Sequence, residues 1–392
     1  MKKPFPLFVL LILIAALFLT VKTFVRPKTS VPNVLNQKKA VSNYPIKRVV
    51  LIVQENHSFD SYFGLFPGAD GFDQNTLLPR LPGEKPSIGL RHTQNTRTPD
   101  LRERAYLKEF DTGREDANGM VAMQYFGKEE IPSYWAYAKN FVLLDRLFSA
   151  VKVRYSVPSH FYLIAATAEG WMTNRMEKTY LTSKTMVDLF KEYSISWKLY
   201  SGESLNKLTG APRDFNYILT FKQHKNEPKV IKNIVPVNQI LGDIKKGSLP
   251  QFSWVFPEVR NSEHPPADVR RGMNYVRNII TEIMKSKHWN DTAVIVIWDD
   301  FGGYYDHVKP VTTDQFGPGP RVPGLVISAY SKKGFIDHTT YNTSSVLKFF
   351  QTLYDLPSLT ERDGKSANML NAFDFEQKPR EPLILPLVPI EK

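Results

Sequence analysis

The chain has 392 residues, of which 42% are hydrophobic, it contains no cysteine, and its formal net charge is +12. Its length allows one large α/β domain or two smaller ones, and the absence of cysteine excludes disulfides, thiolate metal sites and a cysteine nucleophile. Residues 1–54 contain nine Lys or Arg and no Asp or Glu, which leaves 42 basic against 39 acidic residues in the rest of the chain. Because the excess charge lies near the N-terminus, it fits a membrane-proximal segment better than a nucleic-acid groove, and we expect no nucleic-acid partner.

The N-terminus places two lysines before a run from Pro4 to Val21 that has no charged residue. Such a run suits either a secretory signal or a short membrane helix. The residues after it form a poor cleavage site, which favours an uncleaved anchor over a removed signal peptide. We therefore expect a signal anchor or signal peptide at 1–24, a linker at 25–46 and a catalytic domain at 47–392. The domain is expected outside the cytoplasm, either anchored to the membrane by its N-terminal helix or secreted.

Strand and helix patterns alternate along the rest of the chain. A buried strand is predicted first, at Arg48–Gln54, and the strongest amphipathic helix pattern lies at Asp268–Lys285. Alternation of this kind predicts the α/β class, with a mostly parallel sheet covered by helices on both faces. The other predicted elements are, in chain order, helices at 131–140, 160–168 and 185–193, strands at 196–200, 252–256, 293–298 and 324–328, and a helix at 344–353.

Acidic and amide side chains follow two of these strands. Glu55 and Asn56 come directly after the first strand, and Asp299 and Asp300 after a later one. Open α/β sheets bind ligands beyond the carboxyl ends of their strands, so the four side chains suggest one shared site. Their oxygen atoms suit one divalent metal ion, either calcium, magnesium, manganese or zinc. The alternative is that the two aspartates only end a strand and begin the turn at Gly302.

Ser156 is predicted to lie in a loop just before an apolar helix. A helix N-terminus attracts anions such as phosphate, and a serine near a cation that lowers its pKa can attack phosphorus. The alternative is that Ser156 or Ser159 caps the helix.

Three histidines stand in loops with polar neighbours, namely His264, His307 and His338. Such side chains can bind a metal, hold a phosphoryl oxygen or protonate a leaving group. The alternative for each is a structural or solvated histidine.

Three segments together resemble the bacterial phosphoesterase family that contains non-haemolytic phospholipases C and acid phosphatases. They are ENHSFDSYFG, which starts at Glu55, DDFGGYYDHV, which starts at Asp299, and RVPGLVISAYS with the following GFIDHTTYNTSSVLKFF, which starts at Arg321. The resemblance covers most of the chain from Arg48 to Leu356. It implies an alkaline-phosphatase-like three-layer sandwich with a mostly parallel central sheet.

The resemblance also implies roles for individual residues. Ser156 stands at the position of the family's Ser or Thr nucleophile, and His264 at that of an active-site histidine. The family's nucleophile run retains Ser156, Pro158 and His160 here, but Arg154 and Tyr155 replace its Gly-Pro and its Asn is missing. Another family histidine is expected between residues 92 and 110, where only His92 stands at the edge. The metal ligands implied by the resemblance are Glu55, Asn56, Asp299 and Asp300.

These observations predict a metal-dependent hydrolase of phosphate esters, either phospholipase C-like or acid phosphatase-like. Ser156 is its expected nucleophile and forms a phosphoseryl intermediate, with His264 as a second catalytic residue. The expected substrate contacts are His160, His307 and His338, and the expected substrate is a phosphate ester, with a phospholipid as one candidate. The alternative function is a non-catalytic surface protein on the same fold that binds phosphorylated ligands.

Overall fold

A computed structural model describes residues 38–73, 75–79, 86–89, 91–97, 122–175, 179–202, 216–311 and 313–390. Eight of the strands in these ranges form one sheet, in which every strand runs in the same direction except β12. The sheet therefore confirms the expected α/β class and the mostly parallel strand order. From edge to edge, the strands are β13 (Phe335–Asp337), β6 (Val142–Leu144), β12 (Gly324–Ser328), β11 (Thr292–Trp298), β1 (Arg48–Gln54), β10 (Phe252–Phe256), β8 (Trp197–Ser201) and β9 (Ile234–Pro236).

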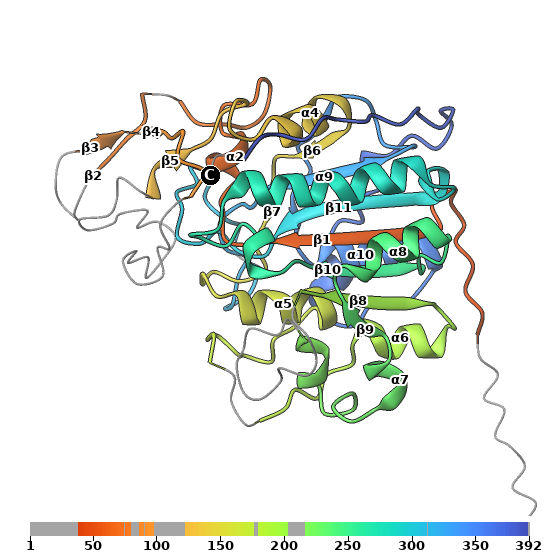
Figure 1. The fold of residues 1–392 in the computed structure, drawn as a ribbon. Helices are drawn as coiled ribbons and strands as arrows, with labels where there is room; N and C mark the ends of the chain where they lie inside the picture. The colour runs from red at the N-terminus through yellow and green to blue at the C-terminus, as the bar shows by residue number, and fades with distance from the viewer. Residues whose placement is uncertain are drawn as a thin grey trace, which may run out of the picture. The chain divides into compact units, whose positions relative to one another are not determined.

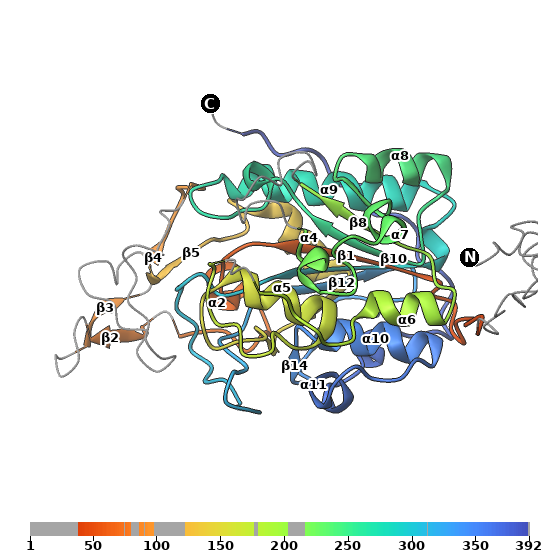
Figure 2. The ribbon, with the colours of Figure 1, turned by 90° about the horizontal axis from the view of Figure 1, so that it is seen from below.

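Helices cover both faces of this sheet and make it the middle of three layers (Figures 1 and 2). One face carries α4 (Pro132–Asn140), α8 (Gln239–Lys246) and α9 (Val269–Lys285), with α9 in contact with both of the others. The opposite face carries α5 (Ser156–Ala165), α6 (Met186–Glu192) and α10 (Ser345–Tyr354), and α11 (Glu361–Lys365) packs against α10. The remaining helices are α2 (Phe59–Phe63), α7 (Pro228–Ile231), η3 (Tyr217–Thr220), η4 (Val259–Asn261), η5 (Trp289–Asp291) and η6 (Leu370–Ala372).

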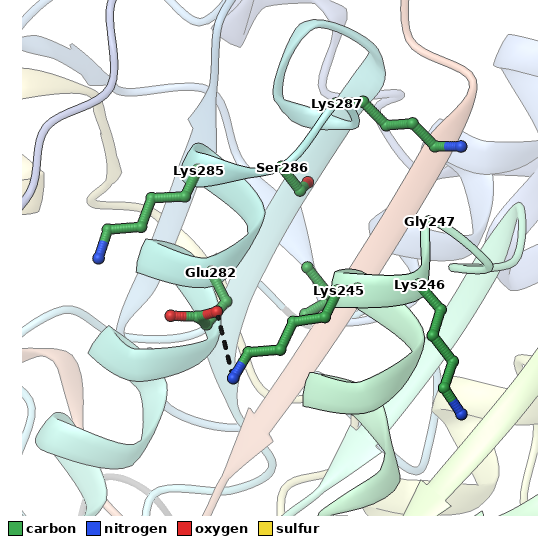
Figure 3. A pocket seen from close by; sticks show the side chains of 8 residues that line it. Lys245, Lys246, Gly247, Glu282, Lys285, Ser286 and Lys287 are labelled. Atoms are coloured by element: carbon green, nitrogen blue, oxygen red, sulfur yellow. Dashed lines mark ion pairs between the residues drawn. The ribbon is translucent and has the colours of Figure 1, made fainter.

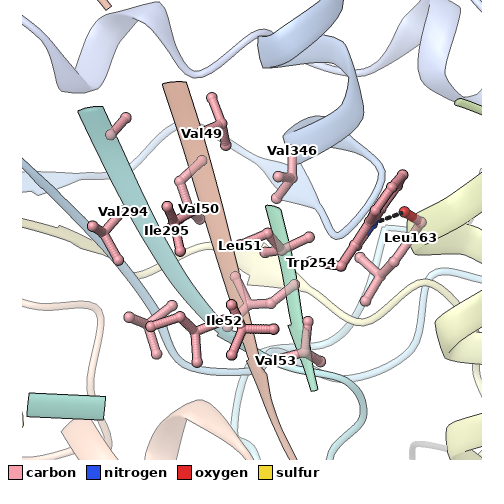
Figure 4. Close-up of a cluster of buried hydrophobic side chains, with 14 of the residues drawn as sticks. Val49, Val50, Leu51, Ile52, Val53, Leu163, Trp254, Val294, Ile295 and Val346 are labelled. Atoms are coloured by element: carbon pink, nitrogen blue, oxygen red, sulfur yellow. Dashed lines mark hydrogen bonds between the residues drawn. The ribbon is translucent and has the colours of Figure 1, made fainter. Parts of the chain in front are cut away.

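The centre of the hydrophobic core lies around β1. This strand pairs with β11 from Arg48 opposite Thr292 to Gln54 opposite Trp298, and with β10 on its other side. Helices on both faces bury it, which explains a nearly continuous apolar sequence in place of an alternating one. In Figure 4 the β1 side chains pack against Trp254, whose indole N–H donates to the carbonyl of Leu163 at 2.9 Å.

Among the described residues, three two-stranded ribbons lie outside the main sheet. They pair β7 (Leu147–Phe148) with β14 (Tyr341–Asn342), β2 (Leu77–Pro79) with β3 (Pro86–Gly89), and β4 (Arg91–His92) with β5 (Gln124–Tyr125).

The predicted membrane segment, residues 1–24, lies outside the described residues, as does most of the predicted linker. The last part of that linker packs against the domain, because Ile46 is fully buried and the Ala40 and Asn43 amides donate to Tyr193 and Leu353. Within the described part of the chain, every helix is too short or too polar to cross a bilayer.

Candidate active site

The two acidic strand ends meet because β1 and β11 are neighbours. Gln54 pairs with Trp298 in register, so Glu55 and Asn56 leave the sheet beside Asp299 and Asp300. The Asp299 amide donates to the Gln54 carbonyl at 2.9 Å, and the Asn56 amide donates to Asp299 Oδ1 at 3.1 Å. The parallel register therefore places at one point two segments that are far apart in sequence, as the strand ends predicted.

Gly302 allows the turn after Asp300 to lie against this point. Its φ is +62°, and a Cβ added to it would stand 2.4 Å from the carbonyl oxygen of Asn56. The Gly302 amide donates to Asp300 Oδ1 at 2.7 Å, which orients that carboxylate. A side chain at this position would strain the backbone and collide with Asn56.

Ser156 lies in α5, on the face of the sheet opposite α9, and its side chain reaches the same group of residues. It is the first residue of α5, one step further into the helix than the predicted loop position, because the extended Tyr155 acts as the N-cap. Its half-buried hydroxyl donates to Glu55 Oε2 at 2.9 Å and lies 3.3 Å from Asn56 Oδ1. The hydroxyl thus points at the candidate metal ligands from the positive end of a helix dipole.

His160 lies one helical turn after Ser156 and is fully buried. Its Nδ1 donates to the Ser156 carbonyl at 2.8 Å, which leaves Nε2 as the basic nitrogen, 3.7 Å from Glu55 Oε1. The ring packs between Tyr217 and Phe256, and burial lowers its pKa, so the neutral form is favoured. His160, Glu55 and Asp299 offer donor atoms within 4.8 Å of one another, so the structure places His160 with the candidate metal ligands. The spacing of four residues from Ser156 was the sequence signal for this arrangement.

The carboxylates of this site repel one another strongly. Burial, together with the charges of Asp299 and Asp300, raises the pKa of Glu55 well above its ordinary value. Asp299 Oδ2 is buried and receives no hydrogen bond from any described residue. A divalent cation would neutralise this charge and would suit the oxygen-rich donor set, with one imidazole nitrogen as a further donor. The residues present therefore fit the expected metal ion.

His264 reaches the same edge of the sheet through the loop after β10. The Glu55 amide donates to the Ser262 carbonyl at 2.8 Å, which ties this loop to the end of β1. The His264 amide donates to Ser262 Oγ at 3.2 Å, and its ring Nδ1 lies 2.6 Å from the Pro265 carbonyl. These contacts orient the partly buried imidazole in a loop that is hydrogen-bonded to the end of β1.

The buried Glu263 anchors the same loop. It accepts hydrogen bonds from Tyr62 (2.6 Å), Tyr134 (2.5 Å) and Gln54 (2.9 Å). Burial raises the pKa of Glu263 to about 7, although these hydrogen bonds lower it. In α9, Gly272 leaves room for this side chain, since a Cβ there would lie 2.2 Å from Glu263 Cγ.

Two further residues of the site were not singled out by the sequence. His57 follows Asn56 and is fully buried against the ring of Tyr304, with ring centroids 4.6 Å apart. Burial lowers the pKa of His57 to about 3, so its imidazole stays neutral. The ring is packed at the end of β1. Tyr217 packs on His160, and burial with the nearby carboxylates raises its pKa. For His57 the signal was its position inside the ENHSFD motif.

The other two predicted histidines lie in a second cluster, which we call the arginine cluster. Its members are Asp60, Asp70, Asp145, Arg146, Asp306, His307, Arg321 and His338. The fully buried guanidinium of Arg321 bridges Asp60 at 2.9 Å and Asp306 at 2.8 Å. His307 Nδ1 lies 2.8 Å from Asp60, and the largely exposed His338 lies 2.7 Å from Asp145. Their predicted contact with substrate stays a prediction.

The pKa of His307 reflects this setting. Burial disfavours its protonation, but the hydrogen bond and charge of Asp60 outweigh burial and raise the pKa above its ordinary value. The raised pKa favours a positive charge on His307 at a higher pH than for an ordinary histidine.

Comparison with known proteins agrees with the motifs. The model of the phosphoesterase family matches residues 46–357. Phospholipase C A of Mycobacterium tuberculosis is 24% identical over 411 residues, covering 85% of this chain and 78% of that protein. Non-specific phospholipase C3 of Arabidopsis thaliana is 26% identical, covering 88% of this chain and 77% of that protein. Non-hemolytic phospholipase C of Burkholderia pseudomallei is 25% identical, and the match covers 84% of this chain but 59% of that protein.

Among solved structures, a protein of the alkaline phosphatase superfamily from Vibrio parahaemolyticus matches 85% of this chain and 72% of its own chain. Its TM-score is 0.45 and its sequence identity 15%. The family match extends over most of the chain and includes both acidic strand ends and Ser156. The protein therefore belongs to the phosphoesterase family of hydrolases, which confirms the family expected from its motifs.

Proposed function

We propose that the protein hydrolyses phosphate esters in a metal-dependent reaction in which Ser156 is the nucleophile and a phosphoseryl intermediate forms. The observation that supports this proposal most directly is the hydrogen bond of 2.9 Å from Ser156 Oγ to Glu55 Oε2. It aims a hydroxyl at a buried group of candidate metal ligands in which burial and the neighbouring carboxylates raise the pKa of Glu55.

Glu55, Asn56, Asp299 and Asp300 would hold one divalent cation, and the position of His160 makes it a fifth candidate ligand. When bound, such an ion lowers the pKa of a nearby hydroxyl and neutralises charge that develops on phosphoryl oxygens. The donor set admits calcium, magnesium, manganese or zinc.

The residues of the chain supply the rest of the reaction. Ser156 Oγ attacks phosphorus as its proton passes to Glu55 Oε2, the atom that already accepts its hydrogen bond. The Oγ–P bond forms, the bond from phosphorus to the alcohol oxygen breaks, and His264 donates a proton to the leaving alcohol. Water then forms a new bond to phosphorus and gives a proton to His264, the Oγ–P bond breaks, and Ser156 Oγ takes back its proton from Glu55, which releases the phosphate product.

For the substrate, we propose a chemical class and not a single compound. Relatives with the name phospholipase C favour a phosphodiester substrate, and a phospholipid headgroup belongs to that class. His307, with its raised pKa, and His338 remain the proposed contacts for the substrate. We also propose that residues 1–24 anchor the catalytic domain, residues 47–392, outside the cytoplasm. The direct contact of Ser156 with the candidate ligands favours a catalytic role over the non-catalytic alternative.

Trapping the intermediate tests this proposal. The protein is mixed with a chromogenic phosphodiester and a divalent cation, quenched in acid during turnover, and digested for mass spectrometry. We expect one phosphorylated peptide, modified at Ser156, and at least a thousandfold loss of kcat in Ser156→Ala.

The matched control is Ser159→Ala on the same helix. Ser159 is buried, and its hydroxyl donates to the Tyr155 carbonyl at 3.1 Å, so this change leaves the site hydroxyl in place. We expect the control to keep its phosphoserine and most of its activity. Full activity in a folded Ser156→Ala protein, or a phosphoryl group on another residue, would reject Ser156 as the nucleophile.

A further inference from the structure

A surface rich in lysine lies at the amino ends of the strands, between the C-terminal ends of α8 and α9. It surrounds an open pocket of about 500 Å³, and its four lysines are Lys245, Lys246, Lys285 and Lys287. We call these four residues the lysine surface. Both helices end here because each leads into the first residue of a parallel strand, β10 after α8 and β11 after α9.

The positive charge of the lysine surface is largely unbalanced. Lys245 lies 3.8 Å from Glu282, the acidic residue that lines the pocket. Lys246, Lys285 and Lys287 are exposed, and none of them has a carboxylate partner within 4.0 Å in the described part of the chain. Lysines near a helix C-terminus also stabilise the helix dipole, and the exposed ammonium groups can do so while they contact another surface.

The directions of these side chains favour a broad partner over a small one. In Figure 3 the amino groups of Lys246, Lys285 and Lys287 point away from one another, while Lys245 turns toward Glu282. A site for one small anion would need ammonium groups that converge on a point. Charges that spread over a surface suit a layer of many anionic headgroups.

The start of the domain lies at the same edge. Residues 38–47 run past the end of α6 and of α10 to the first residue of β1, where Arg48 donates to the Leu249 carbonyl at 3.0 Å. Lys38 and Lys39 are exposed there and add positive charge. The segment that sequence analysis predicts to be a membrane anchor, residues 1–24, precedes this stretch in the chain.

We propose that the lysine surface docks on the headgroups of an anionic lipid bilayer. Charge complementarity and the entry of the chain at the same edge favour a membrane over a soluble protein partner. Each lysine near an anionic bilayer strengthens binding about fivefold, so the four residues together supply a few hundredfold.

Docking in this way fixes the direction of the active site. β1 has seven residues from Arg48 to Gln54, and at about 3.3 Å per residue the strand separates the lysine surface from Glu55 by about 23 Å. The candidate active site therefore faces away from the docked bilayer. This conclusion about the direction of the active site rests on the proposed function. It predicts that substrates reach the site from solution or from a surface that faces the docked bilayer.

The absence of cysteine from the chain allows a direct test with the full-length protein. Asn290→Cys places one fluorophore three residues beyond the lysine surface, and Lys152→Cys places one four residues before Ser156; both native side chains are exposed. The labelled proteins are reconstituted into vesicles that contain a headgroup quencher, with phosphatidylcholine alone or with added phosphatidylglycerol.

We expect phosphatidylglycerol to increase quenching at position 290 severalfold and to leave position 152 unchanged. The triple variant Lys246→Glu, Lys285→Glu, Lys287→Glu should abolish this increase. The matched control, Lys128→Glu, Lys222→Glu, Lys365→Glu, has the same net charge as the triple variant but leaves the lysine surface intact. It should keep the increase in quenching at position 290.

Equal quenching at both positions, an effect of the lipid at position 152 alone, or an equal response of the two triple variants would overturn the proposal. Hydrolysis of a soluble phosphodiester, measured in parallel, is expected to stay at the wild-type rate in both triple variants. Because quenching does not depend on turnover, failure of the docking proposal is distinguishable from failure of the proposed catalytic mechanism.

Discussion

Two groups of buried acidic residues stand next to each other in sequence but differ in how their charge is balanced. In the group around Glu55, Asp299 and Asp300, burial and the charges of the two aspartates raise the pKa of Glu55 well above its ordinary value. The arginine cluster begins only five residues after Glu55, with Asp60, and there Arg321 contacts two carboxylates from a fully buried position.

The difference between the two groups lies in the counter-charge of their buried carboxylates. A buried carboxylate costs free energy unless a positive charge or hydrogen bonds compensate it. The arginine cluster carries its own counter-charge and holds together the turn after α2, the segment around Asp306 and the start of the loop before β12. In the Glu55 group the pKa of Glu55 is raised by burial and by the neighbouring carboxylates, which is a property expected of a catalytic site that binds a metal ion.

The largest effect on activity is expected in the group around Glu55, Asp299 and Asp300. Asp299→Asn keeps the size of the side chain and an oxygen that can accept the hydrogen bond of the Asn56 amide, but it removes a charged candidate ligand. We expect kcat/KM for a phosphodiester to fall about a thousandfold or more. The melting temperature of the wild-type protein should rise when a divalent cation is added, and that of the variant should not. A variant that keeps its activity and its response to cations would remove Asp299 from the metal site.

The next effect concerns the arginine cluster. Arg321→Met leaves Asp60 and Asp306 buried without their cation, so we expect the free energy of unfolding to fall by about 3–5 kcal/mol in urea denaturation. Added divalent cation should not restore the loss. Arg146→Met serves as the control, because Arg146 forms a partly exposed ion pair with Asp70 and should cost about 1 kcal/mol or less.

Glu263 is an intermediate case, since neutral hydroxyl and amide donors surround it. Its pKa in the folded protein is about 7 against an ordinary value of 4.5. The folded state therefore binds this proton more tightly than the unfolded state, and the stabilising contribution of the protonated form is lost as the pH rises from about 4.5 to about 7. The expected loss is up to about 3 kcal/mol.

Glu263→Gln should flatten this part of the pH profile. The measurement is the free energy of unfolding at pH 5 and at pH 7 for both proteins. An equal fall in stability with pH in wild type and variant would contradict the assignment of the proton to Glu263.

The smallest effect is expected at the rim of the arginine cluster. His338 is 61% exposed, and its partner Asp145 is buried. His338→Gln should change the free energy of unfolding by about 1 kcal/mol or less, because water screens an exposed pair. KM for a phosphodiester should rise severalfold if the predicted substrate contact is present, and an unchanged KM would remove His338 from the substrate site.

Most of the sheet could be predicted from the sequence. The strands at 48–54, 252–256 and 324–328 match β1, β10 and β12, and the helix at 268–285 differs from α9 by one residue. These segments are long apolar runs or strongly amphipathic stretches, in which burial on both faces or on one stripe leaves a clear pattern. The proximity of Glu55 and Asp299 was also predicted, because the carboxyl ends of neighbouring parallel strands lie at the same edge of the sheet.

The sequence by itself determined the fold class, the acidic strand ends and the hydroxyl expected above them, since each depends on local pattern or on a motif. Only the tertiary structure decided that His160 joins Glu55 and Asp299, that Arg321 neutralises one acidic group and not the other, and that four lysines gather behind the sheet. These contacts join residues up to 261 positions apart, as Asp60 and Arg321 are. No local pattern records which charged side chain will meet which, because the register of neighbouring strands and the packing of helices on them set those distances.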